Sequence, residues 1–413
     1  MKIRVFSPFL PYPATEGNFV TVYNQVQYLS QRNDVEIVTW MDGTDAYNKK
    51  SQQWNKESPS LRIKRIGCKL NTLETKWQRR LRVLSSILTR TPSRENYYYP
   101  RNLIPQIISL PKADLEIYHH SLAYGWLSKV PNCLGVKRVF MIHDSNAAML
   151  SLQQREEKSY VAFLINKRNV RLLKSHERDL GRLVNELWFV SLKELSEYKN
   201  TNLDITLRFV PPAFDTKNIS KEKLNWKHQK NWNQSKPVFG LLGDLAHTAN
   251  IASAKFIIDE ICPILNRKGF TGKIKIVGRN APQNLLDAAQ RFKFVEIVGF
   301  LEKLDEFWAE ISMMLVPNLV GTGVRIKMLE SIAFGIPVLT HTESAKTIAP
   351  SLANSPLVIT HDGPNEWAQE ILTQHHQNDE TQRIKQTIPK EIEVDEVYRF
   401  LDGDPLDFRY REI

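Results

Sequence analysis

The chain has 413 residues, a formal net charge of +11 at pH 7 and a hydrophobic content of 42%. This length is enough for two domains with full cores, and the hydrophobic content is ordinary for a globular protein. No apolar run reaches the roughly 18 residues that a membrane-spanning helix needs. Three widely spaced cysteines predict neither a disulfide framework nor a zinc site, and they fit a reducing cytoplasm. The basic charge suits an anionic partner, but no nucleic-acid-binding motif accompanies it, so we expect no nucleic acid partner.

The first half of the chain alternates predicted strands with helices, beginning with a strand rather than a signal peptide. Gly17 and Asn18 open the first helix, and they therefore follow the first strand at the point where a doubly wound domain faces its ligand. A plain turn between strand and helix is the alternative. The predicted strands are residues 3–6, 35–40, 115–118, 137–142 and 187–191, and the first helix is residues 19–31.

Residues 76–101 form the most basic stretch, with seven Lys or Arg residues and one Glu. Trp77, Leu81, Leu84 and Leu88 recur at spacings of three and four, which predicts an amphipathic helix. One interpretation is contact with an anionic membrane surface. The other is a solvated helix that covers one face of a sheet, with its arginine stems packed on apolar surface.

His143 follows the predicted strand at residues 137–142. Ligands of doubly wound domains bind at the carboxyl ends of such strands, so His143 is a candidate site residue. A structural histidine at the end of a strand is the alternative.

Residues 213–236 are polar and without periodicity, and we interpret them as a linker between two domains. Repeated strand–helix units follow, which predicts a second, mostly parallel α/β sheet. The predicted strands there are residues 238–243, 273–278 and 295–299, and the predicted helices are residues 250–265 and 303–311.

Residues 312–341 carry the strongest functional signal: a strand at 313–317, a glycine loop at 318–323, a helix at 324–334 and a strand from 338. The first N–H groups of a helix have no internal partner, and its dipole is positive there. Gly321 and Gly323 permit close approach of a ligand to the backbone, and Thr322 can cap the helix. With Arg325 and Lys327 in the first turn, this segment predicts a phosphate or diphosphate site.

Glu330 lies three residues after Lys327 on the same helix face, where its carboxylate could accept two hydroxyl groups such as those of a ribose. The alternative is an ordinary surface pair of Lys327 and Glu330, which would contribute a few tenths of a kcal/mol.

The segment GTGVRIKMLESIAFGIPVLT resembles the nucleotide-sugar signature of GT-B glycosyltransferases, above all the retaining "group 1" enzymes of glycosyltransferase family 4. In that family a helix glutamate binds the ribose, and Glu330 occupies its place. Gly335, Pro337 and Val338 match the end of the signature. The family also has a glutamate eight residues earlier, where this chain has Thr322.

The resemblance implies a site drawn from both halves of the chain. His143 is the counterpart of a histidine that contacts the donor sugar, and the cations usual after the first strand of the second domain are absent. We therefore expect catalytic roles for His143, Arg325 and Lys327. The expected donor-binding residues are Gly17, Asn18, Gly243, Arg279, Gly321, Thr322, Gly323, Val324 and Glu330.

The implied fold is GT-B, an α/β architecture in which two Rossmann-like doubly wound domains face a cleft. We expect an N-terminal acceptor domain at 1–212, the linker at 213–236, a donor domain at 237–390 and a tail at 391–413 that crosses back to the first domain. The resemblance also implies that catalysis needs neither a cofactor nor a bound metal. We reject Asp402-Gly403-Asp404 as a metal-binding motif because no strand precedes it.

The implied reaction moves a sugar, with retention, from a nucleotide diphosphate sugar to a glycan or lipid-linked acceptor in cell-envelope polysaccharide or glycolipid synthesis. A cytoplasmic enzyme, peripheral at the inner face of the membrane, fits this role. One alternative is a glycosyltransferase-like protein that has lost catalysis and only binds, suggested by Thr322 and Asp244. Another is a protein that binds nucleic acid or a membrane surface through its charge alone.

Overall fold

The protein is described here by a computed structural model. It describes residues 1–14, 17–41, 44–66, 103–120, 123–130, 135–143, 159–199, 205–214, 237–317 and 323–376, with isolated residues at 77, 86, 145, 147, 150, 151, 154 and 397. The chain forms two compact units, of which the first includes Met1–Pro212 and the second is Ala213–Val397.

The first unit contains a seven-stranded sheet in the order β3-β2-β1-β4-β5-β6-β7, in which every pair of neighbours is parallel. The direction of winding changes between β1 and β4, as in a doubly wound fold. The central strands are almost wholly buried and are rich in Val, Ile and Phe, as expected where helices cover both faces. The strands are β1 (Lys2–Phe6), β2 (Asp34–Thr39), β3 (Arg62–Arg65), β4 (Leu115–His119), β5 (Lys137–Ile142), β6 (Glu186–Phe189) and β7 (Thr206–Phe209).

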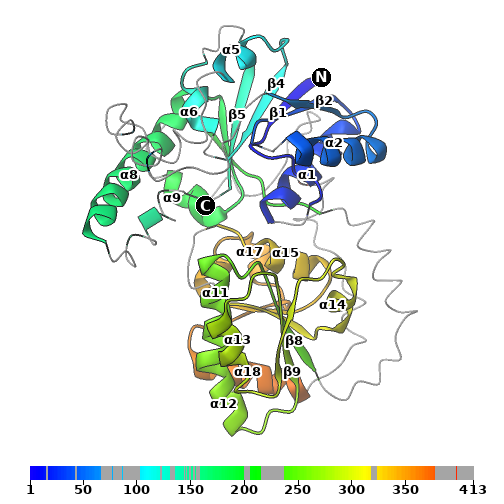
Figure 1. Ribbon diagram of the computed structural model, residues 1–413, viewed down its shortest axis with the longest axis vertical. Coiled ribbons are helices and arrows are strands. Elements are labelled where there is room, and N and C mark those ends of the chain that lie inside the picture. Colours follow the sequence, from blue (N-terminus) through cyan, green and yellow to red (C-terminus); the bar gives the residue numbers. More distant parts are fainter. Residues whose placement is uncertain are drawn as a thin grey trace. The chain divides into compact units, whose positions relative to one another are not determined.

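Helices lie on both sides of this sheet, with α1 and α2 on one side and α5, α6 and α8 on the other (Figure 1). A cluster of buried apolar residues that includes Phe6, Trp40, Leu103 and Phe140 joins the second group to the sheet. The helices are α1 (Gly17–Ser30), α2 (Thr44–Glu57), α5 (Leu103–Ile108), α6 (Tyr124–Leu127), α8 (Tyr160–Asp179) and α9 (Leu192–Lys199), with a 3₁₀ turn η2 (Leu180–Arg182).

The second unit contains a six-stranded parallel sheet in the order β10-β9-β8-β11-β12-β13, with the winding reversed between β8 and β11. Its core is apolar and aromatic, with Phe239, Phe256 and Trp367 at the centre. The strands are β8 (Val238–Leu242), β9 (Lys273–Val277), β10 (Val295–Gly299), β11 (Met313–Val316), β12 (Val338–Thr340) and β13 (Val358–Thr360).

The helices of the second unit also lie on both faces of its sheet (Figure 1). α15 packs against β11 and β12. The helices are α11 (Thr248–Lys255), the π-helical turn η3 (Phe256–Ile261), α12 (Cys262–Arg267), α13 (Gln283–Ala289), α14 (Asp305–Glu310), α15 (Ile326–Ala333), α16 (Thr342–Ala345), α17 (Pro350–Ala353) and α18 (Pro364–His376).

Two predicted helices need correction. The single helix predicted at 250–265 is longer, from Thr248 to Arg267, and contains a π turn closed by a bond from the Cys262 N–H to the Ile257 carbonyl. Pro263 has no N–H to continue the α-helical ladder, which favours the wider turn. The helix predicted at 324–334 begins at Ile326, with Arg325 as its N-cap residue, and Thr322 lies outside the described residues.

Several predictions fall outside the described residues: most of the linker at 213–236, the tail at 391–413 apart from residue 397, and the basic helix at 76–101 apart from Trp77 and Ser86. These remain predictions. No helix in the described part of the chain is both long enough and apolar enough to cross a bilayer.

Candidate active site

The strongest cluster of functional side chains surrounds the point where the second sheet reverses its winding, between β8 and β11. The carboxyl ends of these neighbouring strands, at Leu242 and Val316, lead into the two connections where an open α/β sheet binds its ligand.

Helix α11 ties the two connections together. The Ser253 hydroxyl donates to the carbonyl of Pro317, directly after β11. One turn earlier, the Asn250 amide group donates to the carbonyl of Asp244, after β8, at 2.9 Å. The other end of the same amide accepts from the Lys327 ammonium at 3.2 Å. Asn250 therefore joins α11, the loop after β8 and α15.

Lys327 points from the first turn of α15 toward the end of β8, where its ammonium also donates to the carbonyl of Leu242 at 2.7 Å. Burial, and then the neighbouring Arg325 charge, lower the pKa of Lys327 to about 7, although Glu330 opposes this shift. The ammonium can donate three hydrogen bonds, and the described residues accept two of them. One donor is therefore left for a ligand.

Glu330 lies one turn further along α15 and is half-buried. Burial raises the pKa of Glu330 to about 7, against the attraction of Lys327. Within the described part of the chain its carboxylate accepts no hydrogen bond and forms no ion pair, not even with Lys327. The absence of a described contact between Lys327 and Glu330 counts against the surface-pair alternative, and no described residue occupies either carboxylate oxygen.

The start of α15 lies beside these two side chains. Gly323 is buried and Val324 and Arg325 are half-buried, while Gly321 and Thr322 lie outside the described residues. Because Arg325 is the N-cap residue, the first N–H groups after it, those of Ile326 and Lys327, have no partner within the helix. This is a cationic helix N-terminus.

A second charged pair lies after β8 and β9. The Arg279 guanidinium contacts the Asp244 carboxylate at 2.6 Å, and the Asn280 amide donates to it at 3.0 Å. Although burial opposes the shift, hydrogen bonds from the Ala246 N–H, Arg279 and Asn280 lower the pKa of Asp244 to about 2. Arg279 and Asp244 therefore form an ion pair at this loop, which neutralises the Asp244 charge.

Two glycines allow this close packing of loops. A Cβ atom on Gly278 would lie 1.9 Å from the carbonyl oxygen of Gly243, and one on Gly243 would lie 2.7 Å from the Asn250 side chain. Neither position has room for a side chain. The expected role of Gly243 in binding the donor stays a prediction, because its observed contact is with Asn250.

The first unit has its own cluster, at the carboxyl ends of β4 and β5. His143 follows β5 as predicted, and its Nε2 atom lies 2.9 Å from Nδ1 of His119, the last residue of β4. The ring of His120 stacks on that of His143 with centroids 4.6 Å apart. Among the described residues no group of His, Cys, Asp or Glu could hold a metal ion, these histidines included.

All three imidazoles are held in their neutral form. Burial lowers the pKa of His119 and of His143 well below the usual value, and lowers the pKa of His120 to about 4. The sequence prediction named His143 and missed His119 and His120. The signal was present, because LEIYHH also ends a predicted strand with histidine. Gly17, as predicted, opens helix α1 together with Asn18.

The sequence of the second unit identifies its family. Residues 236–376 match the model of the family described as glycosyl transferases group 1. The chain carries a group 1 glycosyltransferase domain. The matched residues include Asn250, Lys327 and Glu330, so the cluster described above lies inside the glycosyltransferase domain. No curated protein sequence matches the chain.

Solved structures extend the similarity to the whole chain. HepE from Anabaena, in complex with UDP and glucose, is 11% identical over 98% of both chains, with a TM-score of 0.61. Sucrose-phosphate synthase from Thermosynechococcus elongatus is 13% identical over 98% of both chains (TM-score 0.64). TarM is 10% identical over 97% of this chain and 98% of its own (TM-score 0.66). These matches confirm the GT-B fold, and the family match confirms the predicted glycosyltransferase class.

Proposed function

We propose that this group 1 glycosyltransferase moves a sugar from a nucleotide diphosphate sugar to a glycan or lipid-linked acceptor, with retention of configuration. The observation that carries the proposal is the pair of side chains on α15. Lys327 has one ammonium donor left for a ligand, and Glu330 has an unpartnered carboxylate three residues later. A diphosphate next to a ribose presents an anion and two hydroxyl groups, which match the chemistry of these two side chains.

The mechanism follows from where charge develops. The bond between the anomeric carbon and the diphosphate oxygen breaks, and the electron pair stays on the diphosphate. Lys327, Arg325 and the N-terminus of α15 stabilise that negative charge. The acceptor hydroxyl oxygen bonds to the anomeric carbon on the face that the diphosphate leaves, and its proton passes to a phosphate oxygen. Glu330 holds the ribose, and His143 contacts the sugar.

Two sequence features, Asp244 and Thr322, suggested a protein that only binds, and one observed contact bears on the first. Asp244 stands where a cation was expected, but its negative charge is neutralised by the ion pair with Arg279. Arg279 and the glycine loop residues Gly321, Thr322, Gly323 and Val324 are therefore part of the proposed donor site, together with Gly17, Asn18 and Gly243. Thr322 in place of a glutamate is the remaining argument for the binding-only alternative.

We further propose that the enzyme works at the inner face of the membrane, in cell-envelope polysaccharide or glycolipid synthesis. Helix α8 supports this. Its exposed face begins with three apolar side chains, Tyr160, Val161 and Leu164, which are 75%, 66% and 46% exposed. The same face continues with four exposed cations and no exposed acidic residue between them: Lys167, Arg171, Lys174 and Arg178. Apolar residues beside a basic stripe fit an anionic lipid surface.

Within the described residues, the predicted basic segment at 76–101 contacts α8 through Ser86. The Arg168 guanidinium donates to the carbonyl of Ser86 at 2.6 Å. Trp77 in that segment is 67% exposed. The proposed membrane surface is therefore the exposed face of α8, and the predicted basic helix at 76–101 remains a second candidate for the same role.

The first experiment measures thermal shift and hydrolysis with a panel of nucleotide diphosphate sugars, beginning with UDP-glucose, on the wild type and on Glu330→Ala. We expect one donor to raise the melting temperature and to be slowly hydrolysed, and Glu330→Ala to abolish both effects. Glu296→Ala, an exposed glutamate on β10, is the matched control and should change neither.

Three other outcomes would revise the proposal. A donor that stabilises the protein but is never turned over, even with lipid and glycan acceptors, supports the binding-only alternative. If no nucleotide changes the melting temperature, the assignment of residues 321–330 is wrong. For the membrane surface, co-sedimentation with vesicles of anionic lipid should weaken in Leu164→Glu. Equal binding of the wild type and Leu164→Glu would overturn that part.

A further inference from the structure

A chain of hydrogen bonds runs through the interior of the first unit and ends at His143. The Gln25 side chain, on α1, is fully buried, and its Oε1 atom lies 2.8 Å from Nε2 of His119. Nδ1 of His119 lies 2.9 Å from Nε2 of His143. The three side chains come from α1, β4 and the end of β5, so the chain depends on the tertiary fold.

The orientation of the Gln25 amide gives this chain a direction. Its nitrogen donates to the thioether sulfur of Met141 at 3.6 Å, which leaves its oxygen facing His119. A thioether sulfur accepts weakly and cannot donate. The reverse orientation would place the carbonyl oxygen against sulfur with no donor, and the NH₂ group against His119.

An amide oxygen only accepts, so Nε2 of His119 must carry the proton of that ring. A neutral imidazole carries one N–H, and Nδ1 of His119 is therefore an acceptor. It can only accept from Nε2–H of His143. The remaining nitrogen of His143, Nδ1, is then a bare lone pair that no described residue contacts.

The ring of His143 also has a stacking partner, which favours one ring orientation. His120 stacks on it with an interplanar angle of 13°. His120 itself has φ of 65°, a left-handed conformation that is uncommon outside glycine. Strained backbone of this kind is found where a side chain must be held in one place.

We propose that Gln25 and His119 are positioning residues that fix the tautomer of His143, so that its Nδ1 atom accepts a hydrogen bond from a hydroxyl group of the substrate. In this arrangement His143 is an acceptor and not a cationic donor. Its role at a substrate rests on the proposed glycosyltransferase function, whereas the tautomer is a property of the first unit alone.

The consequence for recognition is specific. A lone pair aimed at a substrate favours a hydroxyl group and disfavours an ether oxygen or a carboxylate at the same position, which would repel it. A neutral His143 is also compatible with a sugar that becomes positively charged in the transition state, because its electron-rich nitrogen does not repel that charge. The site therefore selects a sugar with a free hydroxyl group facing His143.

The first test uses NMR of the full-length protein labelled with ¹⁵N at histidine. Long-range ¹H–¹⁵N spectra distinguish the two neutral tautomers, and substitution of each histidine in turn assigns the signals. We expect Nε2–H for both His119 and His143 in the wild type. Nδ1–H on His143 would overturn the proposal, whatever the enzyme does with nucleotide sugars.

The second test reverses the direction of the hydrogen bond between His119 and His143. In Gln25→Glu the carboxylate stabilises a doubly protonated His119, whose Nδ1–H must then donate into Nε2 of His143. His143 would carry its own proton on Nδ1, facing the substrate. Gln27→Glu is the matched control, because Gln27 lies on the same helix and contacts Tyr23 and Ser58 instead of the histidines.

In Gln25→Glu an N–H of His143 would face the substrate hydroxyl in place of a lone pair, and a polar group left unpaired in a site typically costs about 10- to 100-fold, so we expect kcat to fall by that factor. Binding of the nucleoside diphosphate should stay within about twofold, and Gln27→Glu should behave as the wild type. Unchanged tautomers and unchanged kcat in a folded Gln25→Glu would overturn the proposal. A wild type that turns over no donor would refute the proposed function and leave the NMR result to decide the tautomer.

Discussion

The two sheets share their winding but place their buried charge in opposite positions. In the first unit, a row of alternating charges crosses the body of the sheet in register: Arg62 on β3, Glu36 on β2, Arg4 on β1, Glu116 on β4 and Arg138 on β5. In the second unit, Gly240 and Met314 occupy the middle of the comparable row. Lys275 on β9 continues that row and pairs with Glu310 of α14, whereas the site charges, Lys327 and Glu330, lie beyond the ends of the strands.

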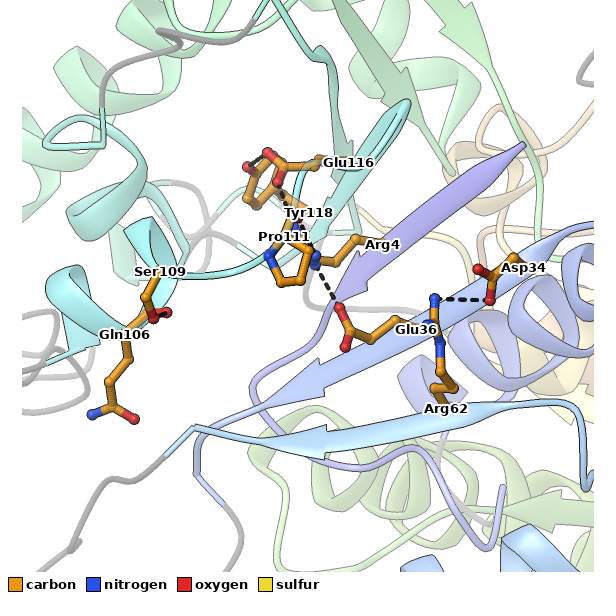
Figure 2. Close-up of polar contacts among 9 residues, drawn as sticks. All are labelled: Arg4, Asp34, Glu36, Arg62, Gln106, Ser109, Pro111, Glu116 and Tyr118. Carbon is orange, nitrogen blue, oxygen red and sulfur yellow. Dashed lines mark hydrogen bonds and ion pairs between the residues drawn. The ribbon is translucent and has the colours of Figure 1, made fainter.

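The two groups of charged residues differ in whether each charge has a hydrogen-bond or ion-pair partner within the protein. Figure 2 shows Arg4 between Glu36 and Glu116, at 2.8 and 3.3 Å, and it also donates to the carbonyl of Pro111. Tyr118 donates to the other oxygen of Glu116. Each charge in this group has its partners within the protein. Glu330 has no such partner among the described residues. We therefore infer that the charged row in the first sheet stabilises the fold, whereas Lys327 and Glu330 in the second unit bind a ligand.

Arg4→Met should have the largest effect, because it leaves Glu36 and Glu116 without their shared cation. Breaking a buried ion pair by removing one partner typically costs about 3–5 kcal/mol, and we expect a loss of that size in the free energy of unfolding, measured with denaturant. Arg62→Met removes the exposed end of the same row and should cost at most about 1 kcal/mol. Equal losses in both variants would contradict the structural role of the row.

Lys327→Met tests the other side of the comparison. Removing a group that stabilises transition-state charge typically costs about 10²- to 10³-fold in kcat, and we expect sugar transfer to fall by that factor. The melting temperature should change little, because the fold gains little from an ammonium whose pKa burial has lowered to about 7. Lys273→Met, on the same sheet, should leave transfer unchanged. A large loss of stability with full activity per folded molecule would reverse the assignment.

Gly240→Ala tests whether close packing of α14 on β8 stabilises the second sheet. A Cβ atom at this position would lie 2.7 Å from the Phe307 ring, because α14 packs directly on the glycine. Overpacking of this kind costs about 1–3 kcal/mol. Thermal unfolding should show that loss, and Phe307→Leu should restore part of it in the double variant. No loss in Gly240→Ala would mean that α14 is not pressed against β8.

Glu330→Gln should give the smallest effect, visible only as a function of pH. Burial raises the pKa of Glu330 from 4.5 to about 7 in the folded protein. Between these values the folded state holds the proton that the unfolded chain has lost, so this group makes stability fall as pH rises. The melting temperature of Glu330→Gln, relative to wild type, should therefore increase between pH 5 and pH 7. The exposed Glu296→Gln should show no such trend.

The sequence predicted the strands of both sheets well, because buried parallel strands are short apolar runs between turn residues. The spans of β5, β10 and β12 begin where they were expected. Three edge strands, β3, β7 and β13, were missed because their residues are half-exposed and carry no such signal. Charged residues inside β1 and β4 gave no warning of the row they form, since each pairs with residues far away in the sequence.

The site was predicted in part for a similar reason. Helical spacing placed Lys327 and Glu330 on one face, but it does not show what lies opposite that face. Asn250, 77 residues earlier, holds the Lys327 ammonium, and only the fold brings them together. The Gln25–His119–His143 chain likewise joins three elements and depends on the direction of an amide group.

The π turn at Phe256–Ile261 has a mechanical consequence for this site. Asn250 and Ser253 precede it and serve the glycosyltransferase site, whereas Cys262 and Leu265 follow it and lie in the core. Each residue of an α-helix advances the chain by about 100° around the axis, so the turn sets the phase between these two groups. Loss of one residue there would rotate Asn250 away from Lys327 while every side chain remained chemically intact. The π turn therefore fixes the rotational position of the site residues of this helix relative to its core residues.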